Sequence, residues 1–419
     1  MHVVMFSDLE STHGGATIAT SRLAEALCAL GHRVTRLVNS PDGQGHLRTT
    51  KEHPWTTKSL APLYRHFVGP KTVRRIVRWT PFRHLASLNA QHSLGRVLAR
   101  LRPDVINVHN LHAGSAIKDG WDPRLLLVCY RYAPTVWTLH DMWSFTGGCA
   151  YSYDCRRFTI GCNSFCQNLP LNSKLIASAW MQRKKLLSQL PNLVAVCPST
   201  WLAQEACAGL WSGHRVLAIP NGLSLKTYQP IDRNVARAAL RISTPGPVLL
   251  TAAQDLTSRR KGGQILVEAI KRVLARPLTL VTLGRCHPEF PFQANGLHVH
   301  HLGYVDDERI KALAYSMSDV LIHPAPVDNL PNTIMEAIAC GTPVVGFATG
   351  GVSDMIRPGQ TGWLTYEISG EALAKTIDKA LDDIHRGMNL RISCRSIAEA
   401  EYDSFLQARR YSDLFESMQ

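Results

Sequence analysis

Long apolar runs are absent from this sequence of 419 residues. No stretch approaches the roughly 18 to 20 apolar residues of a membrane-spanning helix, so we expect no span. The first residues, MHVVMFSDLE, lack the basic and long apolar regions of a secretory signal and have the pattern of a strand. Internal repeats and low-complexity tracts are also lacking. With 45% hydrophobic and 19% charged residues, the composition predicts a globular protein, and we expect it in the cytoplasm.

Acidic residues are nearly missing from one segment. Between Arg48 and Arg102 there are twelve Lys or Arg residues against Glu52 alone, which supplies +11 of the formal net charge of +14. Aromatic residues are interleaved with these cations, a pattern that suits an anionic membrane surface or a lipid phosphate. Nucleic acid is a competing partner, and a solvated basic face without a partner is the third interpretation. The aromatic residues are Trp55, Tyr64, Phe67, Trp79 and Phe82.

Short runs of Val, Ile and Leu recur along the chain, each followed by a helical pattern. This alternation predicts parallel βαβ units and two doubly wound α/β domains. Pro and Gly residues near 218–234 break regular structure before a second series of strands begins. We therefore predict an N-terminal domain over 1–217, a C-terminal domain over 218–394, and a helix over 395–419 that packs back on the first domain. The predicted strands cover 2–7, 32–39, 104–110, 134–140, 192–199, 215–222, 247–253, 278–284, 297–303, 320–326 and 343–348.

Two glycine pairs open predicted helices directly after predicted strands. Gly14-Gly15 leaves backbone N–H groups accessible at a helix N-terminus, which favours a phosphate. Gly262-Gly263 follows Arg259, Arg260 and Lys261, which add cations to the same kind of site. An ordinary turn and a solvent-exposed basic loop are the alternatives at the two places.

Two acids stand out in the stretch VDNLPNTIMEAIACGTPVVGFATGG, residues 327–351. Asp328 lies in a turn at the end of a predicted strand, and Glu336 lies about two turns into the next helix. Carboxylates accept hydrogen bonds from pairs of hydroxyls, so two of them near phosphate-binding loops suit a sugar and a ribose. The alternative is structural, with Asp328 as a helix cap and Glu336 bound to a neighbouring group.

These motifs together resemble retaining glycosyltransferases of family 4, which have the GT-B fold. The stretch from Asp328 resembles the family's E-x7-E region, and RRKGG resembles its Lys-Gly phosphate loop. AIPNG, HHLGYV, HGG and TLHDMW resemble its interdomain segment, nucleotide-base loop, N-terminal glycine loop and active-site histidine segment. The matches follow the family's order over about residues 1–365. The resemblance implies two Rossmann-like domains that face a cleft.

The resemblance also implies a role for each matching residue. Lys261, helped by Arg260, would neutralise the departing diphosphate of a nucleotide sugar. Asp328 would bind hydroxyls of the transferred sugar, Glu336 would bind the ribose, and His140 would line the reaction centre. The implied donor-binding residues are Gly14, Gly15, Arg260, Lys261, Gly284, Gly303, Tyr304, Val305, Asn329, Leu330, Asn332, Thr333 and Glu336.

Family members retain the anomeric configuration and hold the diphosphate without a metal, so we expect both properties and no catalytic cofactor. Three departures from the family pattern are visible. Asp328 is one methylene shorter than the usual glutamate, and Asp255 stands where many relatives have an arginine, for which Arg259 or Arg260 would substitute. Pro331 removes one amide donor near the start of the motif.

Four cysteines are spaced as C-x5-C-x6-C-x3-C within eighteen residues. This spacing fits a four-thiolate zinc site that would hold a loop, and unlinked buried thiols are the alternative. Disulfides are disfavoured in a cytoplasm. The segment resembles exopolysaccharide and colanic-acid type transferases of the family. The cysteines are Cys149, Cys155, Cys162 and Cys166.

The sequence as a whole predicts a hexosyltransferase of polysaccharide biosynthesis. It would move a sugar from a nucleotide sugar to a glycan acceptor that is linked to a lipid. We expect it at the inner face of the plasma membrane, in contact with anionic lipid and without nucleic acid. One alternative is a nucleotide-sugar epimerase or a phosphorylase of the same fold. Another is a non-catalytic protein that binds anionic lipid or nucleic acid, but it leaves Asp328 and Glu336 unexplained.

Overall fold

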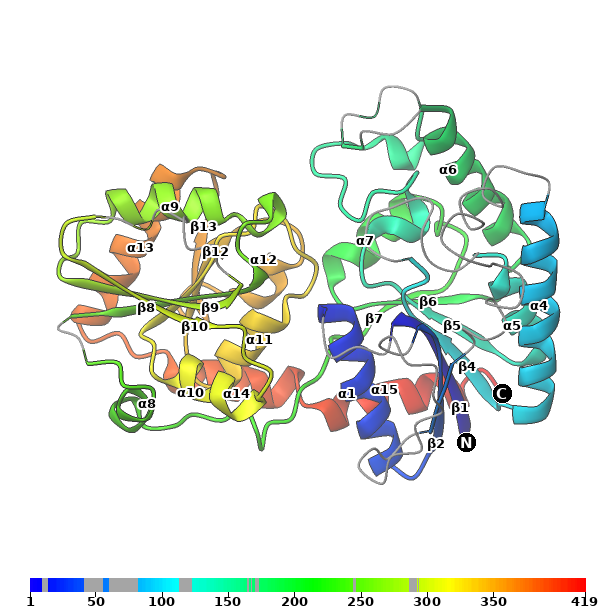
Figure 1. Ribbon diagram of the computed structural model, residues 1–419, viewed down its shortest axis with the longest axis horizontal. Coiled ribbons are helices and arrows are strands. Elements are labelled where there is room, and N and C mark those ends of the chain that lie inside the picture. Colours follow the sequence, from blue (N-terminus) through cyan, green and yellow to red (C-terminus); the bar gives the residue numbers. More distant parts are fainter. Residues whose placement is uncertain are drawn as a thin grey trace. The chain divides into compact units, whose positions relative to one another are not determined.

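The computed structural model divides the chain into two compact units (Figure 1). The first unit comprises Met1–Ile219 and Gln407–Gln419, and the second comprises Pro220–Leu406. Much of the basic segment at 48–102, namely 48–55 and 60–81, lies outside the described residues. The structure describes residues 1–9, 14–40, 56–59, 82–112, 123–163, 166, 168–169, 173–243, 246–285, 292 and 294–419.

The first unit is built on a sheet of seven strands, all of them parallel to their neighbours, in the order β3-β2-β1-β4-β5-β6-β7. Crossovers run outward from β1 in both directions, which is the doubly wound arrangement that the alternating pattern predicts. The strands are β1 (His2–Leu9), β2 (Arg33–Ser40), β3 (Thr56–Ser59), β4 (Val105–Val108), β5 (Thr135–Thr138), β6 (Val194–Cys197) and β7 (Val216–Ala218).

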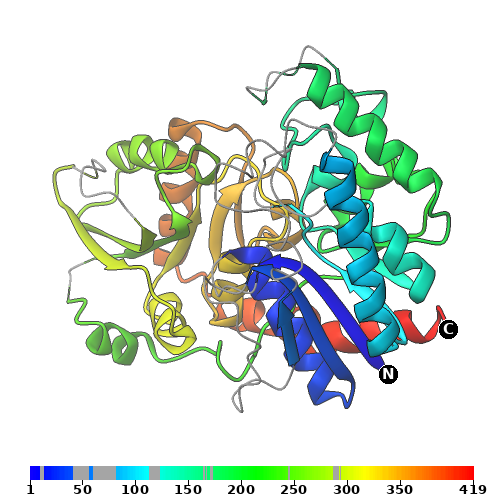
Figure 2. The same cartoon turned by 45° about the vertical axis from the view of Figure 1, so that its right-hand side comes forward.

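Helices cover both faces of this sheet because successive strand residues point to opposite sides. Val4 and Phe6 of β1 join a core with helices α4 to α7, whereas Val3 and Met5 join a core with α1 and α15. Helices α1 and α15 therefore lie side by side on one face (Figure 1, Figure 2). The helices are α1 (Gly15–Ala29), α4 (Phe82–Leu101), α5 (Leu125–Tyr132), α6 (Ser173–Ser188), α7 (Thr200–Ala208) and α15 (Ser404–Glu416).

The C-terminal segment is shared between the units. Tyr411 of α15 hydrogen-bonds through its hydroxyl to Thr138 Oγ1 at the end of β5, at 2.9 Å. The prediction that the whole of 395–419 packs on the first unit is wrong for its first part. Ala398 and Tyr402 are buried in the core of the second unit, so helix α14 (Arg391–Glu401) belongs there.

The second unit contains a six-stranded parallel sheet in the order β10-β9-β8-β11-β12-β13. Its strands are β8 (Val248–Asp255), β9 (Leu278–Arg285), β10 (Leu297–Gly303), β11 (Val320–His323), β12 (Val344–Phe347) and β13 (Gly362–Thr365). Its helices are α8 (Arg233–Ala239), α9 (Gly263–Arg272), α10 (Glu308–Ser316), α11 (Asn332–Ala339), α12 (Val352–Met355), α13 (Gly370–His385) and α14.

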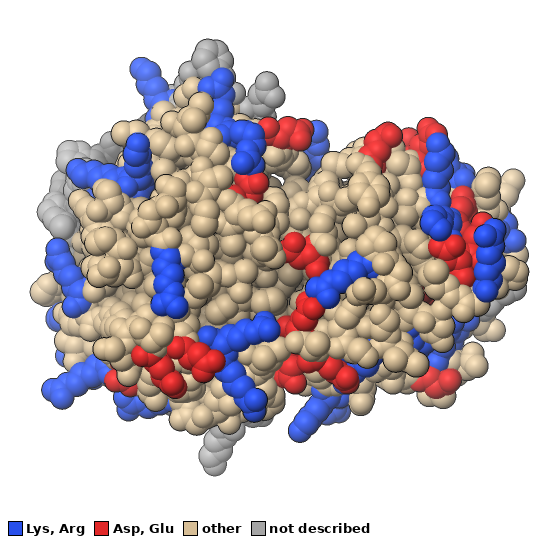
Figure 3. All heavy atoms as spheres, turned by 180° about the vertical axis from the view of Figure 1, so that it is seen from behind, with Lys and Arg blue, Asp and Glu red and all other residues tan. Residues whose placement is uncertain are grey.

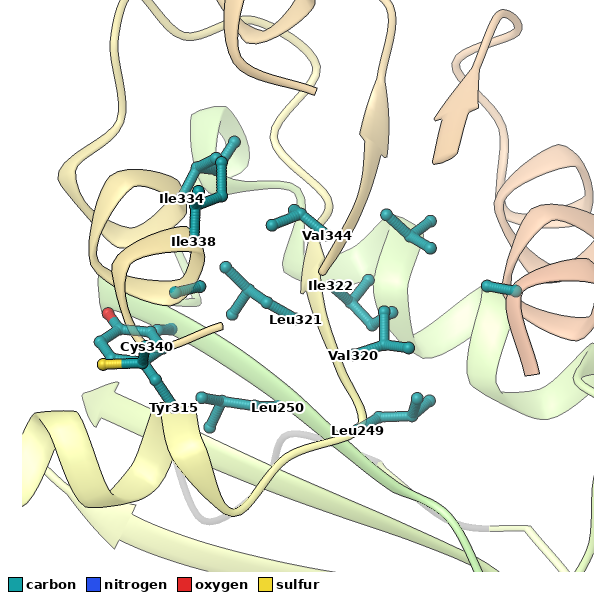
Figure 4. Close-up of a cluster of buried hydrophobic side chains, with 14 of the residues drawn as sticks. Leu249, Leu250, Tyr315, Val320, Leu321, Ile322, Ile334, Ile338, Cys340 and Val344 are labelled. Carbon is teal, nitrogen blue, oxygen red and sulfur yellow. The ribbon is translucent and has the colours of Figure 1, made fainter. Parts of the chain in front are cut away.

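Strand β11 lies in the middle of this sheet and is buried on both faces. Leu321 points toward Ile334 and Ile338 of α11, whereas Val320 and Ile322 point to the opposite side (Figure 4). A strand covered on both faces needs an apolar residue at every position, which explains the unbroken run VLI. The carboxyl end of β11 and the start of α11 are therefore held by the core.

Two strands of the structure are missing from the sequence prediction. Strands β3 (TTKS) and β13 (GWLT) are four residues long, lie at sheet edges and lack a run of Val or Ile. No helix in the described part of the chain is long and apolar enough to cross a bilayer. The face drawn in Figure 3 carries Lys and Arg interspersed with Asp and Glu, a mixture typical of solvated surface.

Candidate functional site

The loop after β8 lies against the residues that follow β11. This loop is a short 3-10 helix, η3 (Arg259–Lys261), and it ends at Gly262 in the left-handed conformation, with φ +70°. A Cβ on Gly262 would lie 1.8 Å from the carbonyl oxygen of Pro324, so only glycine allows this approach. The glycine therefore brings the basic loop to the carboxyl end of β11.

Asp328, in the turn after β11, is held by several donors. Lys261 Nζ donates to Asp328 Oδ2 at 2.6 Å, and Arg260 Nη1 lies 3.4 Å from Oδ1. The backbone N–H of Asn329 also donates to Oδ1, at 3.1 Å. Asp328 is only 6% exposed, so these donors compensate for the water that the carboxylate loses on burial.

The charges of this cluster keep the Asp328 carboxylate ionised. Burial alone would raise its pKa, but Lys261 and Arg260 together outweigh burial and hold the pKa well below its usual range. Burial also lowers the pKa of Lys261, an effect that the charge of Asp328 opposes. An ionised carboxylate has only acceptor oxygens, as the binding of sugar hydroxyls requires.

Gly350 and Gly351, the last two residues of the stretch 327–351, lie against the backbone of Asp328. Gly351 N–H donates to the Asp328 carbonyl oxygen at 3.0 Å. Gly350 has φ +57°, and a Cβ there would lie 2.3 Å from the same oxygen. The close contact with the Asp328 carbonyl oxygen explains why the residue at position 350, after strand β12, is a glycine.

His323 belongs to the same cluster, and the sequence interpretation missed it. It is the last residue of β11 and 3% exposed, and its Nε2 lies 3.8 Å from Asp328 Oδ2. Burial lowers the pKa of His323 to about 4, helped by the charges of Lys261 and Arg260 and opposed by that of Asp328. The imidazole is therefore neutral at pH 7. Its place at the carboxyl end of a central strand was the signal available in the sequence.

Glu336 is the fifth residue of α11 and is buried. Its Oε2 accepts a hydrogen bond from the hydroxyl of Tyr315, on α10, at 2.8 Å. This contact is the structural role considered above as an alternative, and binding of a ribose by Glu336 stays a prediction. Asn332 and Thr333 are the first two residues of α11, where backbone N–H groups have no partner within the helix, and Asn329 and Leu330 lie in the turn before it.

The residues predicted to lie along the base are at the end of β10: Gly303 is its last residue, and Tyr304 and Val305 follow it directly. Tyr304 is 37% exposed, and the guanidinium carbon of Arg285 lies 5.5 Å from its ring centre. Gly303 has φ +70°, and a Cβ there would meet none of the described residues within 4 Å. Val305 packs partly on the core. Gly284 has a structural reason for being glycine, since a Cβ would lie 1.6 Å from Ala253 O. Contact of Gly303, Tyr304 and Val305 with a base, and of Gly284 with the donor, stays a prediction.

Asp255, which stands where many relatives have an arginine, has a structural role of its own. Asp255 Oδ1 accepts hydrogen bonds from the backbone N–H and the hydroxyl of Thr257, so the acid shapes the turn after β8. Arg259 is exposed, whereas Arg260 reaches Asp328. Of the two candidate substitutes for the missing arginine, Arg260 is therefore the one in the cluster.

In the first unit, His140 belongs to a cluster of imidazoles at the carboxyl ends of β4 and β5. His109 Nδ1 lies 3.0 Å from His140 Nε2, with the two rings stacked. His112 Nε2 lies 3.1 Å from Asp141 Oδ2. Burial lowers the pKa of His140 to about 4, with Asp141 opposing and His112 adding to the effect. His109 and His140 are thus both neutral at pH 7, since burial also lowers the pKa of His109.

Gly14 and Gly15 open α1, as predicted from their position after β1. Gly14 is the N-cap residue with φ +101°, a position that has no side chain to cap the helix. Among the described residues, a Cβ on Gly14 would meet only Thr17 Oγ1, at 4.0 Å. Contact with a phosphate stays a prediction.

The two units match known sequence families separately. A model described as Glycosyltransferase Family 4 matches residues 13–227, just over half of the chain. The chain belongs to this family. A second model, Glycosyl transferases group 1, matches residues 246–383 and covers the loops that hold Lys261, Asp328 and Glu336. Family 4 membership thus agrees with the resemblance carried by the motifs.

Curated relatives of this family 4 protein match part of its length. The putative colanic acid biosynthesis glycosyl transferase WcaC of Escherichia coli K12 is 29% identical over 216 residues, 50% of this chain and 51% of WcaC. A GDP-mannose-dependent mannosyltransferase of Corynebacterium glutamicum, named for phosphatidylinositol monomannoside, is 27% identical over 48% of this chain and 55% of its own. The chain thus matches about half the length of these relatives.

Solved structures match this family 4 protein over its whole length. Sucrose-phosphate synthase from Thermosynechococcus elongatus has a TM-score of 0.73 at 19% identity and covers 99% of this chain and 98% of its own. Anabaena HepE in complex with UDP and glucose has a TM-score of 0.66 at 16% identity and covers 100% of both chains. The fold is therefore GT-B, as the sequence predicts.

Four cysteines lie in the segment 149–166 of this family 4 protein, and three of their thiols affect the pKa of the fourth, Cys149. Burial raises the pKa of the Cys149 thiol to about 12, and the nearby thiols of Cys166, Cys162 and Cys155 contribute. Gly147 N–H donates to Cys162 Sγ at 3.2 Å. Within the described residues, however, no group of three or more Cys, His, Asp or Glu is arranged to hold a metal ion. The zinc hypothesis gains no support here and stays a prediction that metal analysis can test.

Proposed function

We propose that this protein is a retaining hexosyltransferase that moves a sugar from a nucleotide-diphosphate sugar to a glycan. The observation that carries the proposal is the cluster of Arg260, Lys261 and Asp328 at the carboxyl ends of β8 and β11. Ligands of open α/β sheets bind at this edge. A lysine and a buried carboxylate, in a chain of family 4, suit the diphosphate and the hydroxyls of one donor.

Each part of the donor has a matching group in the second unit. Lys261 and Arg260 compensate for the charge that develops on the diphosphate as the glycosidic bond breaks. N–H groups at the start of α11 favour the same phosphates without a metal. Asp328 binds hydroxyls of the sugar, Glu336 binds the ribose, and the residues from Gly303 to Val305 lie along the base. HepE, with bound UDP and glucose on this fold, supports a nucleotide sugar as donor.

His140 of the first unit serves the reaction centre in this proposal. The ring is neutral at pH 7 and lies within hydrogen-bond distance of His109. A neutral imidazole can hydrogen-bond a sugar or acceptor hydroxyl without attracting the diphosphate. Configuration at the anomeric carbon is retained, as the motif resemblance implies.

The acceptor is a lipid-linked glycan of polysaccharide biosynthesis. The names of two relatives, for colanic acid biosynthesis and for a phosphatidylinositol mannoside, support this class of acceptor. Three cations of the basic segment have described side chains, and all three are exposed on α4 or directly after it: Arg96, Arg100 and Arg102. They suit contact with anionic lipid at the inner face of the plasma membrane.

A panel of UDP-, GDP- and ADP-linked hexoses tests this function. With a lipid-linked glycan mixture as acceptor, we expect one donor to release its nucleoside diphosphate and to raise the melting temperature. An epimerase would change the donor sugar without an acceptor, and a phosphorylase would require free phosphate. Glu336→Ala should remove the stabilisation by donor. A protein that neither binds nor turns over any member of the panel would refute the proposed function.

A further inference from the structure

Two nitrogen atoms face the same oxygen in the ionic cluster. Asp328 Oδ2 accepts from Lys261 Nζ at 2.6 Å, and His323 Nε2 lies 3.8 Å from it, too far for a hydrogen bond. His323 Nε2 is buried and has no hydrogen-bond partner within the described part of the chain. Buried polar atoms without a partner are rare and carry a free-energy cost, so this atom calls for an explanation.

The other carboxylate oxygen is anchored independently. Asp328 Oδ1 accepts from the backbone N–H of Asn329 at 3.1 Å and lies 3.4 Å from Arg260 Nη1. A rotation of the carboxylate about this anchored side moves Oδ2 by about 1 Å, the distance that separates 3.8 Å from a normal hydrogen bond to His323. Oδ2 can therefore exchange one nitrogen partner for the other with little movement of the chain.

Donor binding supplies the reason for such an exchange. A diphosphate carries more negative charge than a carboxylate, so Lys261 is drawn away from Asp328 when the donor enters. Asp328 would then be left buried beside the sugar without its nearest cation. Burial favours the protonated form of a carboxyl group, which has fewer acceptor sites for sugar hydroxyls.

We propose that His323 is a positioning residue for Asp328 and donates from Nε2 to Oδ2 once Lys261 has turned to the diphosphate. The proposal rests on the proposed function, because it needs a nucleotide-sugar donor in this cluster. Asp328 exchanges an ionic partner for a neutral one and stays an acceptor for the sugar. His323 thereby acts on sugar transfer and contributes little to binding of the nucleoside diphosphate itself.

Three variants at this one position separate the roles. His323→Gln places an amide nitrogen near the position of Nε2, His323→Asn places it near the position of Nδ1, and His323→Leu removes the polar atoms. The measurements are kcat and KM with the donor that wild type uses from the hexose panel, the Kd of its nucleoside diphosphate, and the melting temperature without ligand.

The leucine and asparagine variants should lose about 10- to 100-fold in kcat, the effect of one lost hydrogen bond to a charged group. The glutamine variant should stay within about fivefold of wild type. All three should bind the nucleoside diphosphate within about threefold of wild type and melt no lower, because Nε2 has no partner to lose in the free protein.

Equal kcat in all four proteins, or equal losses in the glutamine and asparagine variants, would overturn the proposal while wild-type turnover still supported the proposed function. A leucine variant that melts lower and loses affinity for nucleoside diphosphate in proportion would show a purely structural role and would overturn it as well. Wild type without affinity or turnover for any nucleotide sugar would instead refute the proposed function.

Discussion

The imidazole cluster of the first unit and the ionic cluster of the second occupy the same kind of place in two similar sheets. Both follow the carboxyl ends of central parallel strands. His109 and His140 are neutral and stacked on each other, whereas Lys261, Arg260 and Asp328 are charged and paired. The comparison teaches that the sheet supplies only the place, and that the loops decide which side chains occupy it.

The loops of the two units also differ in how tightly their own chain holds them. Gly262 and Gly350 are pressed against carbonyl oxygens of Pro324 and Asp328, so a Cβ at either position has no room. Gly14 in the first unit has no such contact with the described residues, of which only Thr17 Oγ1 comes within 4.0 Å of a Cβ there. The ionic cluster is therefore built on a backbone that only glycine permits. Substitution of Gly262 or Gly350 should destabilise the second unit more than substitution of Gly14 destabilises the first.

The largest effect should come from Lys261→Ala. Removal of the cation deprives the diphosphate of its nearest positive charge, and we expect a loss of about 10²- to 10³-fold in kcat/KM. The pKa of Asp328 should rise in the variant, because Lys261 is the largest factor that lowers it. Lys271→Ala, at an exposed position near the end of α9, is the matched control and should leave kcat/KM unchanged. Equal activity of the two variants would contradict the assignment.

A second comparison separates backbone conformation from steric contact. Gly262 and Gly359 have φ of +70° and +75°, but only Gly262 has a carbonyl oxygen within reach of a Cβ. We expect Gly359→Ala to lower the free energy of unfolding by about 1–2 kcal/mol and Gly262→Ala by about 3 kcal/mol or more. Urea unfolding of both variants measures the difference, and equal losses would show that the contact with Pro324 O is unimportant.

The free energy of unfolding should also decrease as the pH is lowered through a defined window. The pKa of His323 is about 4 in the folded protein and about 6.5 when unfolded, so only the unfolded chain binds its proton between these values. The free energy of unfolding should therefore decrease as pH falls from 6.5 to 4, by up to about 3 kcal/mol from this residue. Asp328, whose folded pKa is depressed, adds a loss only below about pH 4.

Urea unfolding at pH 7, 5.5 and 4 tests this window. His323→Leu should make the free energy of unfolding depend less steeply on pH. His298→Leu, at an exposed position of β10, should leave this dependence unchanged. The same pH dependence in both variants would show that His323 titrates normally in the folded protein. His140 and His109 should leave a residual slope in the leucine variant, because the pKa values of both are lowered by burial.

The smallest effect should come from Arg260→Ala. Its side chain is 37% exposed and its Nη1 lies 3.4 Å from Asp328 Oδ1, so solvent screens the contact. We expect the donor KM to rise about threefold. Arg259→Ala, one position earlier and exposed, serves as control. A loss as large as that of Lys261→Ala would show that Arg260 is the principal phosphate ligand.

The strands that the sequence predicts are those that carry a run of Val, Ile or Leu, whether they are central like β11 or lie at a sheet edge like β7 and β10. Runs such as VLI at 320–322 leave no alternative to a central strand, and all eleven predicted runs contain strands of the structure. The missed strands β3 and β13 are short edge strands, whose residues are held by pairing with one neighbour and carry little apolar signal.

The candidate site was predictable where it depends on a motif and not where it depends on tertiary contact. Lys261 and Asp328 were predicted as site residues from the motifs in their loops, and the structure brings their side chains together. Tyr315 was missed because a tyrosine in an ordinary helix has no local pattern, and His323 was missed because its only signal was its position at the carboxyl end of a central strand. Their meeting with Asp328 and Glu336 results from the packing of β11 with α10 and α11.

The central claim is that the second unit binds the donor and the first unit's His140 acts only in transfer. The most direct test is binding of the nucleoside diphosphate, measured by calorimetry beside single-turnover transfer, in wild type, His140→Ala and Lys261→Ala. We predict unchanged affinity with about 10²-fold slower transfer for His140→Ala, and lost affinity for Lys261→Ala. Undiminished affinity in Lys261→Ala, or affinity lost equally in both variants, would contradict the account.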